Sequence, residues 1–160
     1  MTAMTIRRAV AGDEGLVLAL LRELADYEKL LDVFHITEDV IRRDYLGAEP
    51  LCHADLAFEG DAPVGIATWY WKYASFRARR LIHLEDLFVR PACRGKGYGV
   101  ALLAHMARKA VAADGAVDWF VLDWNKPSID FYDSMGARPI AGWLSYRLEG
   151  EAAKALAARG

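Results

Sequence analysis

The segment Arg94-Gly95-Lys96-Gly97-Tyr98-Gly99 is the most informative part of this 160-residue chain. An apolar run ends just before it, and a stretch with helical periodicity begins at about Gly97, so we expect a strand, a tight loop and a helix. Glycines let successive backbone N–H groups turn into one concavity at the positive end of the helix dipole. Arg94 and Lys96 can add charge-assisted contacts. The segment predicts a phosphate-binding loop, and a glycine-rich surface turn is the alternative.

Other phosphate-binding motifs fit this segment poorly. The chain has no GxxxxGK[ST] sequence, which excludes a Walker loop. The glycines are spaced G-x-G-x-G and not G-x-G-x-x-G, so a nicotinamide cofactor is disfavoured.

Four strands and two helices are expected before the loop. A short strand at Ile6–Ala9 comes first, and the later apolar and β-branched runs predict strands over 53–58, 63–73 and 81–89. A helix opens at Gly12-Asp13, and a second helix begins after the N-cap residue Thr37. The first of these helices carries an apolar stripe at Val17, Leu20, Leu21, Leu24 and Tyr27.

A crossover is expected after the loop. The helix that starts near Gly97 has an apolar stripe that we place at Val100, Leu103, Ala104, Ala107 and Val111. A strand over 117–122, a helix from Pro127 to Gly136 and a last strand over 143–148 follow. This order predicts one α+β domain over 1–160, with a mixed, mostly antiparallel sheet and helices on both faces.

Composition excludes several classes of protein. A hydrophobic fraction of 54% with 26% charged residues is typical of a globular domain. Twenty basic and 22 acidic residues leave no excess of positive charge for nucleic acid. Cys52 and Cys93 form neither a CxxC nor a zinc motif, so we expect free thiols and no metal. The first residues lack the apolar core of a signal peptide and no run is long enough to span a membrane, which predicts a cytoplasmic protein without membrane contact.

The strand over 81–89 carries two adjacent carboxylates, Glu85 and Asp86. Strict alternation places His83 with Glu85 on one face and Ile82, Leu84, Asp86 and Phe88 on the other. Charges within an apolar strand are costly unless they are paired or used. One interpretation is an ion pair with Arg77, Arg79 or Arg80. The other is general-base chemistry, which requires a carboxyl whose pKa is raised by burial.

The helix after Pro127 presents three polar side chains on one side. Asn125, Ser128 and Tyr132 have spacings of three and seven residues, which aligns them near the helix start. Tyr132 could be a packing residue with a satisfied hydroxyl or a proton donor.

Several segments together resemble the GNAT superfamily of N-acetyltransferases. Arg94-x-x-Gly97-x-Gly99 matches its acetyl-CoA motif, R/Q-x-x-G-x-G/A. Residues 84–89, 124–132 and 136–137 are similar to the spermidine/spermine (diamine) acetyltransferase branch, as are residues 23–28. The similarity covers nearly the whole chain.

This resemblance implies a sheet that splits into a V with acetyl-CoA in the opening, and a homodimer. It implies direct attack of a small-molecule primary amine on the thioester, with Tyr132 as general acid and Glu85 as base, directly or through water. Tyr27, Glu28, Glu85 and Asp86 would then bind the amine. The cofactor contacts would be Leu87, Phe88, Val89, Arg94, Gly95, Lys96, Gly97, Tyr98, Gly99, Val100, Asn125, Ser128 and Tyr132.

The substrate class does not follow directly from this resemblance, because the chain departs from the diamine pattern. Arg77, Arg79 and Arg80 stand in a loop where the family has an acid, and Lys29 follows Glu28. These charges favour a short amine with a carboxylate, such as lysine or thialysine, over a long polycation. Two alternatives are a non-catalytic acyl-CoA-binding sensor and an acetyltransferase acting on protein or peptide amines.

Overall fold

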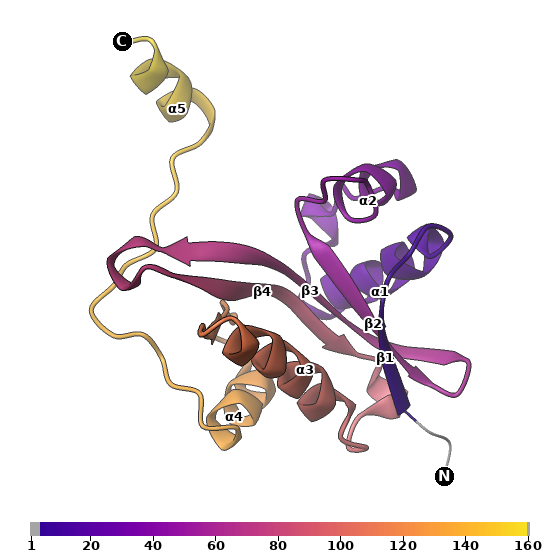
Figure 1. The fold of residues 1–160 in the computed structure, drawn as a ribbon. Coiled ribbons are helices and arrows are strands. Elements are labelled where there is room, and N and C mark those ends of the chain that lie inside the picture. Colours follow the sequence, from indigo (N-terminus) through magenta and orange to yellow (C-terminus); the bar gives the residue numbers. More distant parts are fainter. Residues whose placement is uncertain (1–3, 160) are drawn as a thin grey trace. The chain divides into compact units, whose positions relative to one another are not determined.

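The computed structural model describes residues 4–159, and the chain divides into two compact units, one ending at Phe120 and one starting at Val121. The first unit contains one sheet in the order β1-β2-β3-β4-β5 (Figure 1). The strands are β1 (Met4–Arg8), β2 (His53–Glu59), β3 (Ala62–Ala74), β4 (Arg79–Val89) and β5 (Val117–Asp118). Neighbours from β1 to β4 are antiparallel, and β4 pairs with β5 in parallel. The predicted mixed, mostly antiparallel sheet is therefore confirmed.

Helices cover both faces of this sheet. Helices α1 (Glu14–Tyr27) and α2 (Glu38–Asp44) lie on one face, and α3 (Tyr98–Ala112) lies on the other (Figure 1). As predicted, α1 begins after Gly12-Asp13, and Thr37 caps α2 by accepting a hydrogen bond from the Val40 N–H at 3.3 Å. Short 3-10 turns occupy 31–33, 75–77 and 91–93.

The core on the α1 side follows the predicted stripe, whereas the face assigned to α3 was wrong. Leu20 and Leu24 of α1 pack with Leu56, Ile66 and Phe88 of the sheet. Of the predicted face only Leu103 is buried in α3, whereas Val111 is 73% exposed. The other buried side chains of this helix are Tyr98, Leu102, Met106 and Ala110. This helix is apolar on nearly every side, so periodicity could not single out the face that packs.

The strand that follows the parallel crossover, β5, is shorter than predicted. β5 ends at Asp118, not at Leu122, and Phe120 is largely exposed. A run of apolar residues becomes a strand only where a neighbouring strand receives its hydrogen bonds. Pairing between β4 and β5 covers only Ile82↔Val117 and His83↔Asp118. Beyond His83, β4 therefore has no β5 neighbour.

The second unit contains α4 (Lys126–Ser134) and α5 (Gly150–Ala157). The last strand predicted over 143–148 is not formed, because these residues have no strand partner within the described chain. Trp143, Leu144 and Tyr146 are 77%, 80% and 88% exposed. Helix α5 was not predicted, since residues 150–157 have no capping side chain to mark its start. Whether residues 1–160 act as one domain stays a prediction. None of the helices within residues 4–159 is long and apolar enough to cross a membrane.

Candidate active site

A β-bulge in β4 reorients the side chains around the two adjacent carboxylates. Thr68 of β3 pairs with Asp86, but the next residue, Trp69, pairs with Leu84, so Glu85 is the additional residue. Beyond the bulge, Tyr70 pairs with His83. Asp86 and His83 therefore share the face of the sheet that carries Thr68 and Tyr70. The predicted grouping of Asp86 with Leu84 and Ile82 was wrong because strict alternation ignores a bulge.

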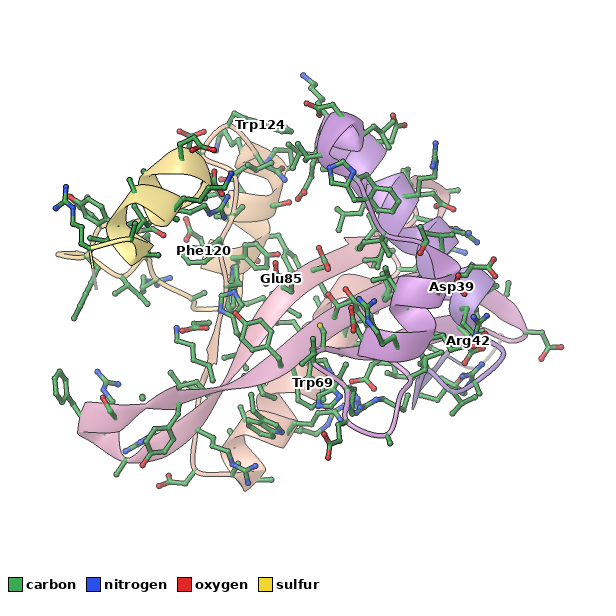
Figure 2. All side chains as sticks on the ribbon, turned by 90° about the horizontal axis from the view of Figure 1, so that it is seen from above. Asp39, Arg42, Trp69, Glu85, Phe120 and Trp124 are labelled. Atoms are coloured by element: carbon green, nitrogen blue, oxygen red, sulfur yellow. The ribbon has the colours of Figure 1, made fainter. Side chains whose placement is uncertain are left out.

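Three carboxylates, which we call the acid cluster, gather on this face: Glu28, Glu85 and Asp86. Glu28 caps the C-terminal end of α1, and burial raises the pKa of its carboxyl. Burial, with the negative charges of Glu85 and Glu28, raises the pKa of Asp86 to about 6, while the hydrogen bond from Thr68 opposes this shift. Figure 2 shows Glu85 on the opposite side of the strands from Trp69.

In the structure, the raised pKa and the access to water that a base needs belong to two different carboxylates. We required a carboxyl whose pKa is raised by burial, and that carboxyl is Asp86. The Glu85 side chain is 55% exposed, and its Oε2 lies 3.6 Å from Nε2 of His83. The predicted proximity of His83 and Glu85 is confirmed. An amine could thus be held by Asp86 while Glu85 keeps access to water.

Two residues near the acid cluster were not predicted. Burial raises the pKa of Tyr45 at the end of α2, and Cys52, Asp86 and Glu85 raise it further. The pKa of Cys52 is raised to about 12 by burial and by Asp86 and Glu85. This thiol remains protonated at neutral pH, which disfavours an acyl-cysteine intermediate. Neither residue belongs to a sequence motif that could have identified it.

Arg79 and Arg80, the first two residues of β4, do not contact the acid cluster. Arg80 lies over the Trp71 ring at 4.7 Å, and Trp71 belongs to the face that carries Trp69. Arg79 opens β4 six residues before Glu85, which corresponds to roughly 20 Å along an extended strand. Among the described residues, Glu85 is instead paired with His83 and Asp86 with Thr68. The alternative of an ion pair with Arg77, Arg79 or Arg80 was therefore wrong.

The glycine-rich loop has the backbone geometry that phosphate binding requires. Gly95 and Gly97 have φ values of +77° and +86°, in the left-handed region that favours glycine. Gly97 is the N-cap of α3, so the N–H groups of Tyr98, Gly99 and Val100 lie in its first turn, where no helical carbonyl can accept them. A Cβ at Gly95 or Gly97 would have no atom within 4 Å. The loop therefore needs glycine for its conformation and leaves open space beside it.

The two basic side chains of the loop are engaged within the protein. Arg94 Nε donates to the Val89 carbonyl at 3.0 Å, and its guanidinium lies 4.8 Å from the Tyr27 ring. Lys96 Nζ lies 3.1 Å from a Glu59 carboxylate oxygen. Arg94 thus connects the loop to the end of α1, next to Glu28. Lys96 is thus paired with Glu59, and its contact with a diphosphate stays a prediction.

The end of β4 provides an edge beside this loop. Leu87, Phe88 and Val89 pair with β3 on one side, and β5 does not extend to them on the other. Backbone N–H and C=O groups on an unpaired edge can bind the amides of an extended ligand. The edge and the α3 N-terminus together can accept a chain of amides that ends in a diphosphate, which is the chemistry of coenzyme A.

The remaining predicted site residues belong to the second unit. Asn125 is buried and caps α4, and its Oδ1 accepts a hydrogen bond from the Ser128 N–H at 3.4 Å. The Tyr132 ring lies 5.3 Å from that of Phe131. Gly136 ends this segment with φ +86°, as predicted. The capping role of Asn125 was not predicted, and the role of Tyr132 as an acid stays a prediction.

Comparison with known proteins agrees with this geometry. Residues 18–137 match the Acetyltransferase (GNAT) family. Thialysine N-epsilon-acetyltransferase of Sus scrofa is 39% identical and aligns over 99% of this chain and 100% of its own length. A human spermidine/spermine N(1)-acetyltransferase-like protein is 32% identical over 94% of this chain and 23% of its own length. The solved structure of an integron cassette protein from the V. cholerae mobile metagenome superposes with a TM-score of 0.82 at 25% identity, covering 98% of each chain.

Proposed function

Since this chain belongs to the GNAT family of acetyl-CoA-dependent N-acetyltransferases, we propose that it acetylates the terminal amine of a short amino acid such as thialysine or lysine. The observation that carries this proposal is the acid cluster at the end of α1, beside the strand that leads to the glycine-rich loop. Three carboxylates favour a cationic amine at this position. The full-length similarity to thialysine acetyltransferases supports the amino acid as the substrate class.

Polyamines are the second candidate substrates. Arginines near the amine site would disfavour them, but Arg80 instead stacks on Trp71. A long polycation therefore meets no repulsion from that residue at the acid cluster. The spermidine/spermine acetyltransferase-like relative supports this candidate.

The proposed mechanism is direct transfer. Asp86 and Glu28 attract the ammonium, and Glu85 accepts its proton, directly or through water. The amine nitrogen then attacks the thioester carbonyl carbon, and the C–S bond breaks as the tetrahedral intermediate collapses. Tyr132 donates its phenolic proton to the departing sulfur, a transfer that is uphill by only about 2 kcal/mol between groups of pKa ~10 and ~8.5.

An amine panel tests this function. The release of free CoA thiol would be followed with thialysine, lysine, putrescine and spermidine at fixed ionic strength. We expect kcat/KM to be highest for thialysine or lysine. A tenfold advantage of spermidine would assign the chain to the polyamines. Thiol release with none of the four amines would overturn the assignment to small amines and favour a protein amine or a binding role.

We also propose that the enzyme is a homodimer in a reducing compartment. A homodimer is supported by the exposed side chains of Trp143, Leu144 and Tyr146, which lie in a segment without a strand partner among the described residues. Sedimentation at micromolar concentration should give a species near twice 17.8 kDa, and a single species near 17.8 kDa would contradict the dimer. The free thiols of Cys52 and Cys93 support a reducing compartment such as the cytoplasm.

A further inference from the structure

The imidazole of His83 lies between two carboxylates. Its Nδ1 is 2.7 Å from Oδ1 of Asp118, and its Nε2 is 3.6 Å from Oε2 of Glu85. Asp118 reaches this position because β5 pairs with β4 at His83↔Asp118, one of the two residue pairs that join these strands. The short parallel pairing therefore connects the proposed base to a residue of the neighbouring strand.

Neighbouring side chains hold this histidine in place. Its ring centroid lies 5.1 Å from that of Tyr70 and 5.3 Å from that of Phe120, and only 5% of the side chain is exposed. Figure 2 shows Phe120 on the same side of the strands as Glu85. The second oxygen of Asp118 accepts a hydrogen bond from Lys72 Nζ at 2.5 Å. The charged and titratable groups that face His83 are thus Glu85 and Asp118, with the Tyr70 phenol beside the ring and Lys72 behind Asp118.

The hydrogen bond to Asp118 determines the tautomer of a neutral His83. A carboxylate can only accept, so Nδ1 carries the proton and Nε2 presents its lone pair to Glu85. The Nε2 lone pair and the negative Glu85 carboxylate repel each other until a proton lies between them. A proton that arrives on Glu85 is therefore stabilised by Nε2, and an imidazolium would lie between two negative charges.

We infer that Asp118 and His83 form a proton relay that takes the amine proton from Glu85. This inference rests on the proposed role of Glu85. The substrate ammonium gives its proton to the Glu85 carboxylate, and the resulting carboxylic acid passes it to Nε2 of His83. The N–H bond of the amine breaks, an N–H bond forms on the imidazole, and Glu85 returns to a carboxylate. His83 then releases the proton to water after the products leave. In this relay His83 and Asp118 act on the amine only through Glu85, so both are positioning residues.

The test is the pH profile of kcat/KM for His83→Gln, measured with thialysine and acetyl-CoA. We expect a loss of roughly 10- to 100-fold at pH 7 that shrinks to less than threefold near pH 9.5, where the amine needs less help to lose its proton. A merely structural role would lower activity by the same factor at every pH, and that result would overturn the relay. Asp118→Asn should reproduce the profile while keeping the imidazole, and it provides the test if His83→Gln does not fold.

Two further variants separate this inference from the proposed function. Glu85→Gln alone tests the base, and the Glu85→Gln/His83→Gln double variant should be no slower than Glu85→Gln, since the two residues act in one path. If the loss of kcat/KM in the double variant equalled the product of the two single losses, the relay would be contradicted, but Glu85 would remain the base. His105→Gln is the matched control, because His105 Nε2 also lies 3.6 Å from a carboxylate, that of Asp55, on the side of the sheet that α3 covers. Its activity should remain within twofold of the wild type at every pH.

Discussion

The Thr68 hydroxyl donates a hydrogen bond to Oδ2 of Asp86, directly across the β3–β4 pair. This bond is one residue from the bulge at Glu85, so the two adjacent carboxylates differ in environment. Asp86 is partly buried and its pKa is raised to about 6, whereas Glu85 is half exposed. One strand thereby presents a partly buried group that can hold a cation and an exposed group that can exchange protons with water.

Asp86→Asn should stabilise the protein and weaken amine binding. A partly buried carboxyl whose pKa rises from 3.8 to about 6 costs up to about 3 kcal/mol of folding stability at pH 8. Asn keeps the acceptor for Thr68 and removes the charge, so the Tm should rise at pH 8. The native state binds the additional proton between about pH 4 and 6, so the gain should fall to roughly a third at pH 4.5 and nearly vanish below about pH 3.5. An equal or lower Tm at pH 8 would contradict the assigned burial of this charge.

Amine affinity should depend on pH through the same group. Below about pH 6, Asp86 becomes neutral and the acid cluster loses one negative charge. We expect the Kd of thialysine, measured by calorimetry, to increase roughly three- to tenfold between pH 7.5 and pH 5, about 1 kcal/mol. The change should be absent in Asp86→Asn. An unchanged wild-type Kd over this range would place the ammonium away from Asp86.

Gly97→Val should weaken acetyl-CoA binding by at least tenfold. The residue has φ +86°, which a β-branched side chain adopts only with strain, and the added bulk would occupy the open side of the loop. Gly12→Val is a matched control, because Gly12 has φ +101° and a Cβ added there would have no atom within 4 Å, but it precedes α1. Calorimetry that shows equal affinity in a folded Gly97→Val variant would remove this loop from the cofactor site.

Tyr132→Phe should lower kcat by roughly 10²- to 10⁴-fold with little change in acetyl-CoA affinity, the range expected when a general acid is lost. The change removes one hydroxyl from α4 and retains the ring that lies beside Phe131. Tyr73→Phe, at an exposed position of β3, is the control and should retain full activity. A Tyr132→Phe rate within threefold of the wild type would mean that water or another group protonates the thiolate.

Much of the fold could be predicted because local signals determine it. Thr37 caps α2, Gly97 and Gly136 occupy positive-φ positions at helix ends, and the α1 stripe packs as its periodicity indicated. The wrong predictions have one physical cause: each depended on a strand neighbour or a packing surface that the sequence alone does not identify. Residues 119–122 and 143–148 have the composition of strands but no neighbouring strand within the described chain, and α3 could pack on more than one apolar face.

The candidate site was predicted in its residue types but not in its geometry. The motif around Glu85 and Asp86 identified the acids, yet the bulge at Glu85 could not be derived from alternation. Contacts between distant segments were also missed, including the packing of Tyr45 and Cys52 near Asp86 and the bond between His83 and Asp118. These contacts depend on strand register, which no local pattern in this chain specifies.

The sharpest test of the proposed amine site is the pH dependence of kcat/KM for Glu85→Gln with thialysine and acetyl-CoA. If Glu85 removes the amine proton, the variant should lose roughly 10²- to 10³-fold at pH 7, and the deficit should shrink as the pH approaches the amine pKa of ~10. Calorimetry should show unchanged acetyl-CoA affinity. A loss below threefold at pH 7 in a folded variant would contradict the assignment of the acid cluster as the catalytic amine site.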